Sequence, residues 1–93
     1  MKYEIIQTSQ FKKDYKLAQK QGKDMSLLKS ILYKLANDEK LPPEQRDHAL
    51  SNNFNGYREC HIQPDWLLIY EIRGDVLVLM LYRLGTHSEL FKK

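Results

Sequence analysis

The feature that most constrains this chain is the stretch 56–70, in which two strand-forming segments follow each other with almost no interruption. Side chains alternate across a strand, so His61 would lie on one face of the first segment and Cys60 on the other. Pro64 and Asp65 separate the two segments, and the chain's only Trp begins the second. The stretch predicts an antiparallel hairpin whose turn region brings an imidazole, a carboxylate and a large ring together.

Length and composition predict one small globular domain over residues 1–93. The chain is 42% hydrophobic and 29% charged, which is typical of a folded protein. No apolar run is long enough to cross a bilayer and the N-terminus has no apolar signal segment, so we expect no membrane contact and a cytoplasmic location. The single cysteine, Cys60, cannot form an internal disulfide, and we expect it to be a packed strand residue rather than a nucleophile.

Two segments in the first half predict helices. Thr8 or Ser9 is expected to cap the first helix, because a hydroxyl oxygen there accepts from an amide of the first turn. Gly22 is expected to end it, and Asp24 to cap the second helix. An apolar stripe over residues 27–35 then predicts an antiparallel helical hairpin laid across one face of a sheet.

The remaining strands are predicted at the two ends of the chain. Residues 3–6 are strand-forming, and Gly74 with Asp75 signals a tight turn before the apolar run 76–82. We expect that run to be a central strand buried on both faces. Residues 37–47 contain two prolines and are expected to form an irregular connection.

Positive charge is concentrated in the first half of the chain, although the net charge is only +3. Residues 1–46 hold 10 Lys and Arg against 6 Asp and Glu, and residues 47–93 hold 5 against 6. A basic stripe runs along the first predicted helix: Lys12, Lys13, Lys16 and Lys20. It is either a solvated helix face or a surface that contacts phosphates.

All three histidines, His48, His61 and His87, lie in the second half. Imidazole has an ordinary pKa of roughly 6.5, so it can give or take a proton near neutrality. Two histidines on opposite sides of a phosphodiester could cleave RNA without a metal. One would remove the 2′-hydroxyl proton, and the other would protonate the leaving 5′-oxygen.

Aromatic and basic residues near the histidines could hold an RNA substrate. Trp66 and Phe91 could stack on a splayed base. Arg58 or Arg83 could bind the phosphate and stabilise the charge that develops on it.

Two other interpretations of the histidines remain open. With Asp65 they would provide enough ligands for zinc or iron, although no pair has the short spacing of a local metal site. They could also be ordinary surface or strand residues with no chemical role.

Several segments of the chain resemble the YafQ-type toxins of the RelE/ParE superfamily, almost from end to end. They include Gly56-Tyr-Arg58, and the most specific are His61-Ile-Gln-Pro-Asp-Trp66 and Gly85-Thr-His87. The resemblance implies a RelE-like α+β fold, a small antiparallel β-sheet with an N-terminal helical hairpin packed on one face. It also implies a type II toxin–antitoxin system toxin: a ribosome-dependent mRNA endoribonuclease, or mRNA interferase, that cuts in the decoding site and is held inactive by a cognate antitoxin.

The resemblance further implies residue roles. His87 is the candidate general acid, His48 the preferred base and His61 the alternative, while Asp65 would orient a histidine or serve as the base itself. Trp66 and Phe91 would shape the substrate pocket, and the helical lysines would contact ribosomal RNA. No cofactor or metal is implied. The alternative from another class is a non-catalytic module of the same fold that only occupies RNA or a partner.

Overall fold

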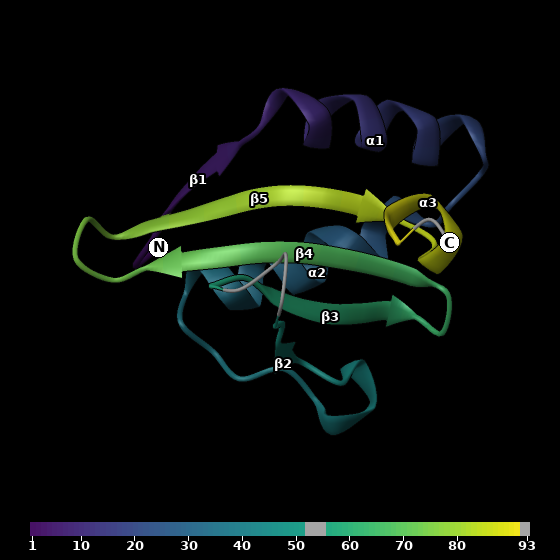
Figure 1. Cartoon of the computed structure of the whole chain (residues 1–93). Helices are drawn as coiled ribbons and strands as arrows, with labels where there is room; N and C mark the ends of the chain where they lie inside the picture. The colour runs from purple at the N-terminus through teal and green to yellow at the C-terminus, as the bar shows by residue number, and fades with distance from the viewer. Residues whose placement is uncertain (52–55, 92–93) are drawn as a thin grey trace.

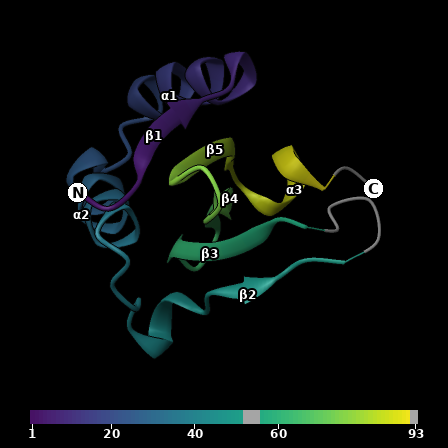
Figure 2. The same cartoon turned by 90° about the vertical axis from the view of Figure 1, so that its left-hand side faces the viewer.

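A five-stranded sheet lies between two long helices and a third, short helix in the computed structural model, which describes residues 1–51 and 56–91 (Figure 1, Figure 2). Its elements in chain order are β1 (Glu4–Gln7), α1 (Ser9–Lys20), α2 (Met25–Ala36), the 3-10 helix η1 (Pro43–Gln45), β2 (His48–Ala49), β3 (Arg58–Gln63), β4 (Trp66–Arg73), β5 (Val78–Gly85) and α3 (His87–Leu90). Within these described ranges, no helix has the length and apolarity that crossing a membrane requires.

The strands are ordered β1-β5-β4-β3-β2, and all neighbours except one pair are antiparallel. The exception is β1, which runs parallel to β5 with Glu4 opposite Val78. The predicted α+β fold is confirmed, and the difference is that the sheet is mixed rather than wholly antiparallel. β1 and β5 lie at opposite ends of the chain, so no tight turn forces them to run in opposite directions.

Both long helices begin at predicted caps. Of the two candidates for the first helix, Thr8 is the cap, and its hydroxyl oxygen accepts from Phe11 N at 3.0 Å. Asp24 Oδ1 accepts from Ser26 N at 3.0 Å at the start of α2. The chain turns between the helices at Gly22, whose φ of 77° suits a residue without a side chain. The two helices lie together on one side of the sheet, as the helical hairpin predicted (Figure 2).

β4 divides its side chains between two apolar clusters. Trp66, Leu68 and Tyr70 point toward α1 and α2 and belong to the main core. Leu67 and Ile69 point the other way, into a smaller cluster that includes Leu90 of α3. We call the first side of the sheet the helix face and the second the open face. The strand is buried on both sides because each face has a cover of its own.

The predicted strand over residues 76–82 begins two residues later than expected. Val76 and Leu77 are 59% and 50% exposed and lie in the turn before β5, where Leu77 has a φ of 55°. Within β5, Leu79 and Leu81 are fully buried in the main core. The prediction that this strand is buried on both faces is therefore wrong for its first half, since α3 covers the open face only near its end.

Candidate active site

The structure brings the three predicted histidines together on the open face. The ring centroids of His48 and His61 are 6.5 Å apart, and those of His61 and His87 are 5.6 Å apart. They come from β2, β3 and α3, respectively, with His61 in the middle of the row. Three imidazoles from three separate elements therefore lie side by side on one face of the sheet.

His48 is placed by the pairing of β2 with β3, which sets it opposite Glu59. Its Nδ1 lies 2.7 Å from the backbone carbonyl oxygen of Arg46. A carbonyl can only accept, so Nδ1 carries the proton and donates it. In the neutral ring, Nε2 then carries the lone pair that can accept a proton. The His48 side chain is half-exposed, so a ligand can reach it.

Asp47, the residue before His48, is held by side chains on the helix face. Asp47 Oδ1 accepts from Arg58 Nε at 3.1 Å and from the Tyr70 hydroxyl at 2.5 Å. Burial and this hydrogen bond to Asp47 both raise the pKa of Tyr70, so its hydroxyl stays a donor. The two-residue strand β2 is thus fixed to β3 and β4 by side chains as well as by its own ladder.

His87 is held by Asp65, which lies in the turn between β3 and β4. Asp65 Oδ1 accepts from the backbone N of His87 at 2.9 Å and from the ring Nδ1 at 2.6 Å. The backbone hydrogen bond and then the ring hydrogen bond hold the pKa of Asp65 below its ordinary value. An ionised carboxylate only accepts, so the Nδ1 of His87 donates and its Nε2 faces away from Asp65.

A buried carboxylate connects the other two rings. Glu59 Oε1 lies 3.5 Å from His48 Nε2 and 3.4 Å from His61 Nε2, and the Glu59 side chain is only 7% exposed. A buried carboxylate needs a hydrogen-bond donor, and His61 Nε2 can supply one while the His48 ring stays neutral. The sequence reasoning gave Glu59 no role, although its position two residues before His61 on the same strand face was a usable signal.

The helix that carries His87 is fitted closely to the end of β5. Thr86 caps α3 in a reciprocal box with Glu89, whose carboxylate accepts from the Thr86 backbone N at 2.8 Å. That hydrogen bond holds the pKa of Glu89 below its ordinary value. A Cβ on Gly85 would come within 3.0 Å of Glu89 Oε1 and 3.1 Å of Leu90 Cδ2. The glycine therefore lets α3 approach the strand, which fixes the place of His87.

Both predicted phosphate-binding arginines have partners within the fold, and a contact between either one and phosphate stays a prediction. Arg58 alternates to the helix face, opposite to His61, and its Nε donates to Asp47. Arg83 donates through Nε and Nη2 to Asp14 of α1, a buried carboxylate that also accepts from Leu84 N. Both guanidinium groups fasten elements of the fold to one another.

The prediction that Trp66 stacks on a base is wrong, because the residue is 1% exposed and lies in the main core. Its role at the site is indirect, since it anchors the strand that follows Asp65. Phe91 is half-buried and packs against the open-face cluster beside α3. A contact between Phe91 and substrate stays a prediction.

The basic stripe is exposed on α1, where none of its four lysines contributes to the core. The C-terminal end of that helix lies near α3, because Gln21 Nε2 donates to Glu89 Oε2 at 3.2 Å. The stripe thus ends on the side of the molecule that carries His87.

The part of the chain that the structure describes contains no group of three or more His, Cys, Asp or Glu side chains arranged to hold a metal ion. Cys60 is fully buried, and burial raises the pKa of its thiol. The expectation that it packs in the core is confirmed.

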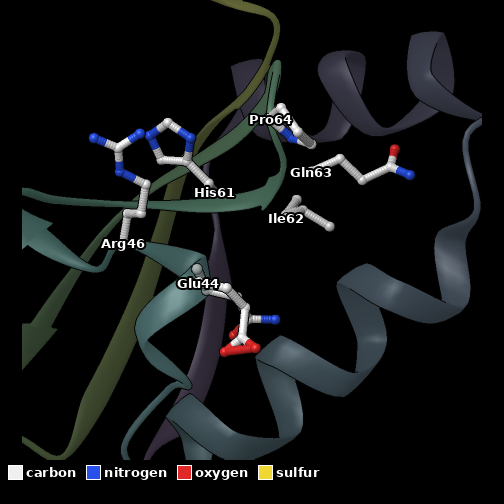
Figure 3. A pocket seen from close by; sticks show the side chains of 7 residues that line it. Glu44, Arg46, His61, Ile62, Gln63 and Pro64 are labelled. Atoms are coloured by element: carbon white, nitrogen blue, oxygen red, sulfur yellow. The ribbon is translucent and has the colours of Figure 1, made fainter.

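One cation beside the histidines, Arg46, was given no role in the predictions from sequence. Arg46 lies in the left-handed region with a φ of 50° and is exposed, and its side chain lines the same pocket as His61 (Figure 3). The connection that carries it was expected to be irregular and contains η1. The available signal was its position, two residues before His48.

A family model described as the bacterial toxin of type II toxin–antitoxin system, YafQ, matches residues 3–92. The mRNA interferase toxin YafQ of Escherichia coli (strain B / BL21-DE3) is 44% identical over 89 residues, which is 95% of each chain. The YafQ chain in a crystal structure of the E. coli DinJ–YafQ complex superposes with a TM-score of 0.88 at 43% identity, over 96% of this chain and 98% of that one. A metal-bound toxin from Helicobacter pylori superposes with a TM-score of 0.91 at 42% identity, over 98% and 100%.

Proposed function

The chain belongs to the YafQ family of bacterial toxins of type II toxin–antitoxin systems, and on that premise we propose that it is an endoribonuclease that cleaves messenger RNA on the ribosome. The observation that carries the proposal is the row of three imidazoles on the open face, because acid–base cleavage of RNA needs two proton-exchanging groups about one linkage. The curated E. coli relative named above is an mRNA interferase, which supports the same reaction class.

In the proposed reaction, His48 is the general base and His87 the general acid. His48 Nε2 takes the 2′-hydroxyl proton, the 2′-oxygen attacks the phosphorus, and the bond to the 5′-oxygen breaks as His87 Nε2 donates a proton to it. The products are a 2′,3′-cyclic phosphate and a 5′-hydroxyl. His61 lies between the two and stabilises the charge on the non-bridging phosphate oxygens.

Fixed acceptors support this assignment of the two outer rings. The Nδ1 atoms of His48 and His87 are bound by the Arg46 carbonyl and by Asp65, so in both rings Nε2 is the atom that can exchange a proton with the substrate, with Glu59 lying 3.5 Å from the Nε2 of His48. Asp65 accepts two hydrogen bonds from His87, which supports an orienting role over service as the base. No step in the scheme uses a metal ion.

Dependence on the ribosome is proposed from the openness of the site. The side chains of His48 and His87 are 51% and 52% exposed, so the chain alone does not enclose a substrate. Alignment of the attacking oxygen, phosphorus and leaving oxygen contributes a large share of such rate enhancements, and a scaffold has to provide it. The exposed lysines of α1 are proposed to contact ribosomal RNA in the cytoplasm.

A cognate antitoxin is the proposed inhibitor. The E. coli YafQ of the complex described above is bound to DinJ, and the high structural similarity over nearly the whole chain supports an equivalent partner here. Such a partner has to prevent messenger RNA from reaching the histidine row.

Primer extension on ribosome-bound messenger RNA tests the proposal. The wild-type protein should produce discrete new 5′ ends on ribosomes and far fewer on free RNA. His87→Gln should lower the single-turnover rate by about 10²- to 10⁴-fold, because it removes one positioned proton donor. Binding without new 5′ ends would contradict cleavage and favour a non-catalytic module.

A chelator distinguishes the proposed mechanism from a metal-assisted one. Cleavage by the protein should be unchanged after treatment with EDTA and dialysis into a buffer that maintains intact ribosomes. Because a similar H. pylori toxin is metal-bound, the treated protein should also be assayed with added copper or zinc. Restoration of lost activity by either metal would contradict the metal-free scheme.

A further inference from the structure

A pocket of about 490 Å³ opens beside the histidine row, between η1 and the end of β3 (Figure 3). Sites for small molecules typically occupy roughly 300–1,000 Å³, so the pocket is large enough for a nucleotide. Ile62 and Pro64 provide apolar walls, and His61 lines it on the side of the proposed reaction. The pocket therefore adjoins the histidine row through His61, although His48 and His87 do not line it.

Its polar groups are distributed unevenly. The Arg46 side chain projects to the same side as the His61 ring, whereas Glu44 lies at the lower end of the view (Figure 3). Gln45 lies next to Glu44, and its side-chain oxygen is buried without a hydrogen-bond partner among the residues the structure describes. An unpaired buried acceptor costs free energy, so the Gln45 side chain would gain by turning into the pocket to meet a donor.

We propose that this pocket is a nucleotide subsite of the messenger RNA, with Arg46 binding the phosphate and the Gln45 side chain turning into the pocket to accept from the base. The inference rests on the proposed function, because it takes the linkage cut at the histidine row as its starting point. The phosphate next to the scissile one would lie at Arg46, and its nucleotide would turn into the pocket. Single-stranded RNA is commonly read in this way, by bases splayed from the backbone into protein pockets.

The chemistry of the walls selects the kind of base. Gln45 Oε1 and the Glu44 carboxylate are acceptors, so they favour a base edge that presents N–H donors, such as an exocyclic amine. The negative charge of Glu44 would oppose a phosphate at that end, whereas Arg46 attracts one beside His61. The subsite thus has an orientation, with the backbone toward the histidines and the base toward η1.

The first test measures binding of a messenger fragment whose riboses all carry 2′-O-methyl groups, so that it cannot be cut. Arg46→Gln should lower the slope of log affinity against log salt by about 0.7, because one phosphate contact to a single strand is lost. The backbone carbonyl that orients His48 is retained in this variant. Arg73→Gln is the charge-matched control, since Arg73 pairs with Glu71 at the opposite end of β4 and should leave the slope unchanged.

The second test replaces adenine by unsubstituted purine at each position of the same fragment in turn. Loss of the exocyclic amine should weaken binding to the wild type by about 2- to 10-fold at one position adjoining the linkage, which is the usual worth of one hydrogen bond. Gln45→Met, which keeps the side-chain length, should abolish that preference. Nuclear magnetic resonance signals of the Gln45 side-chain amide should shift when the adenine fragment binds.

The outcomes separate the subsite from the proposed function. An unchanged salt slope in Arg46→Gln, or an adenine preference that survives Gln45→Met, would overturn the subsite even if wild-type protein cuts messenger RNA. Binding with these signatures but without cleavage on ribosomes would instead retain the subsite and overturn the proposed reaction.

Discussion

The two faces of the β3–β4 hairpin differ in what they contribute to the protein. On the helix face, Cys60 and Leu68 are completely buried against α1 and α2 and have no group that exchanges a proton near neutrality. On the open face, Glu59 and His61 form part of a row of ionisable side chains that extends to exposed rings at both ends. Neighbouring residues of one strand therefore belong to the core and to the candidate active site in turn.

This difference shows how a short chain can hold a candidate active site without a large core. Strand alternation allows one hairpin to be stabilised from one side and to present chemistry on the other. The open face still needs local supports, and these are Asp65, Glu59 and the capped α3. Mutations on the two faces should accordingly separate stability from activity.

Leu68→Ala should have the largest effect on stability, because it leaves a cavity in the helix-face core. We expect the free energy of unfolding to fall by about 2–5 kcal/mol in urea titrations. The half-exposed Leu17 of α1 provides the matched control, and Leu17→Ala should change stability by only about 0.5 kcal/mol. Equal effects of the two substitutions would contradict the division between faces.

Glu59→Gln should weaken catalysis through the rings that the carboxylate holds. Because Glu59 lies within 3.5 Å of His48 Nε2, its substitution and His48→Gln should be non-additive in single-turnover cleavage. A coupling of about 0.5–3 kcal/mol is expected for groups in direct contact. Additive effects, with no coupling beyond about 0.3–0.5 kcal/mol, would show that Glu59 does not act through His48.

Asp65→Asn should have a smaller effect on stability, since the pair with His87 is exposed, but a defined dependence on pH. The pKa of Asp65 is lowered in the folded state, so its contribution is complete above the ordinary value of about 4 and is lost as pH falls through the folded value. The difference in Tm between wild type and variant should shrink as the pH falls below about 4. A difference that grows over that acidic range would have the wrong sign.

Charge reversal on α1 should have the smallest effect and leave the fold unchanged. Lys12→Glu with Lys16→Glu should weaken ribosome binding, and more so at low salt, because phosphate contacts release counterions. Reversal at Lys29 and Lys40, which are exposed outside the stripe, is the control. Equal loss of binding in both double variants would reduce the stripe to a non-specific contribution of charge.

Much of this arrangement could be predicted because it depends on local rules. Alternation, the separating pair of Pro64 and Asp65, and the helix caps at Thr8 and Asp24 specify elements from residues that are close in sequence. The resemblance of Gly85-Thr-His87 to the toxin motif also implied that His87 belongs to one site with His48 and His61, and the three rings are adjacent.

What could not be predicted depends on contacts between distant segments. The parallel pairing of β1 with β5 joins two distant parts of the chain, and Arg83 donates to Asp14 of α1. The face of Trp66 follows from strand register, which turned the ring into the core. Arg46 reaches the site only because β2 pairs with β3 and places η1 beside it.

The central claim, that adjacent residues of β3 divide stability from chemistry, is tested most directly by comparing Cys60→Ala with His61→Gln. Each variant should be assayed for urea unfolding and for single-turnover cleavage of ribosome-bound messenger RNA. Cys60→Ala should lower the free energy of unfolding by about 0.5–3 kcal/mol and leave the cleavage rate of the folded protein intact. His61→Gln, which retains an N–H donor for the Glu59 carboxylate, should slow cleavage by at least about 100-fold with little change in unfolding. Cleavage by His61→Gln at the wild-type rate, or a loss in Cys60→Ala as large as that predicted for His61→Gln, would contradict the account.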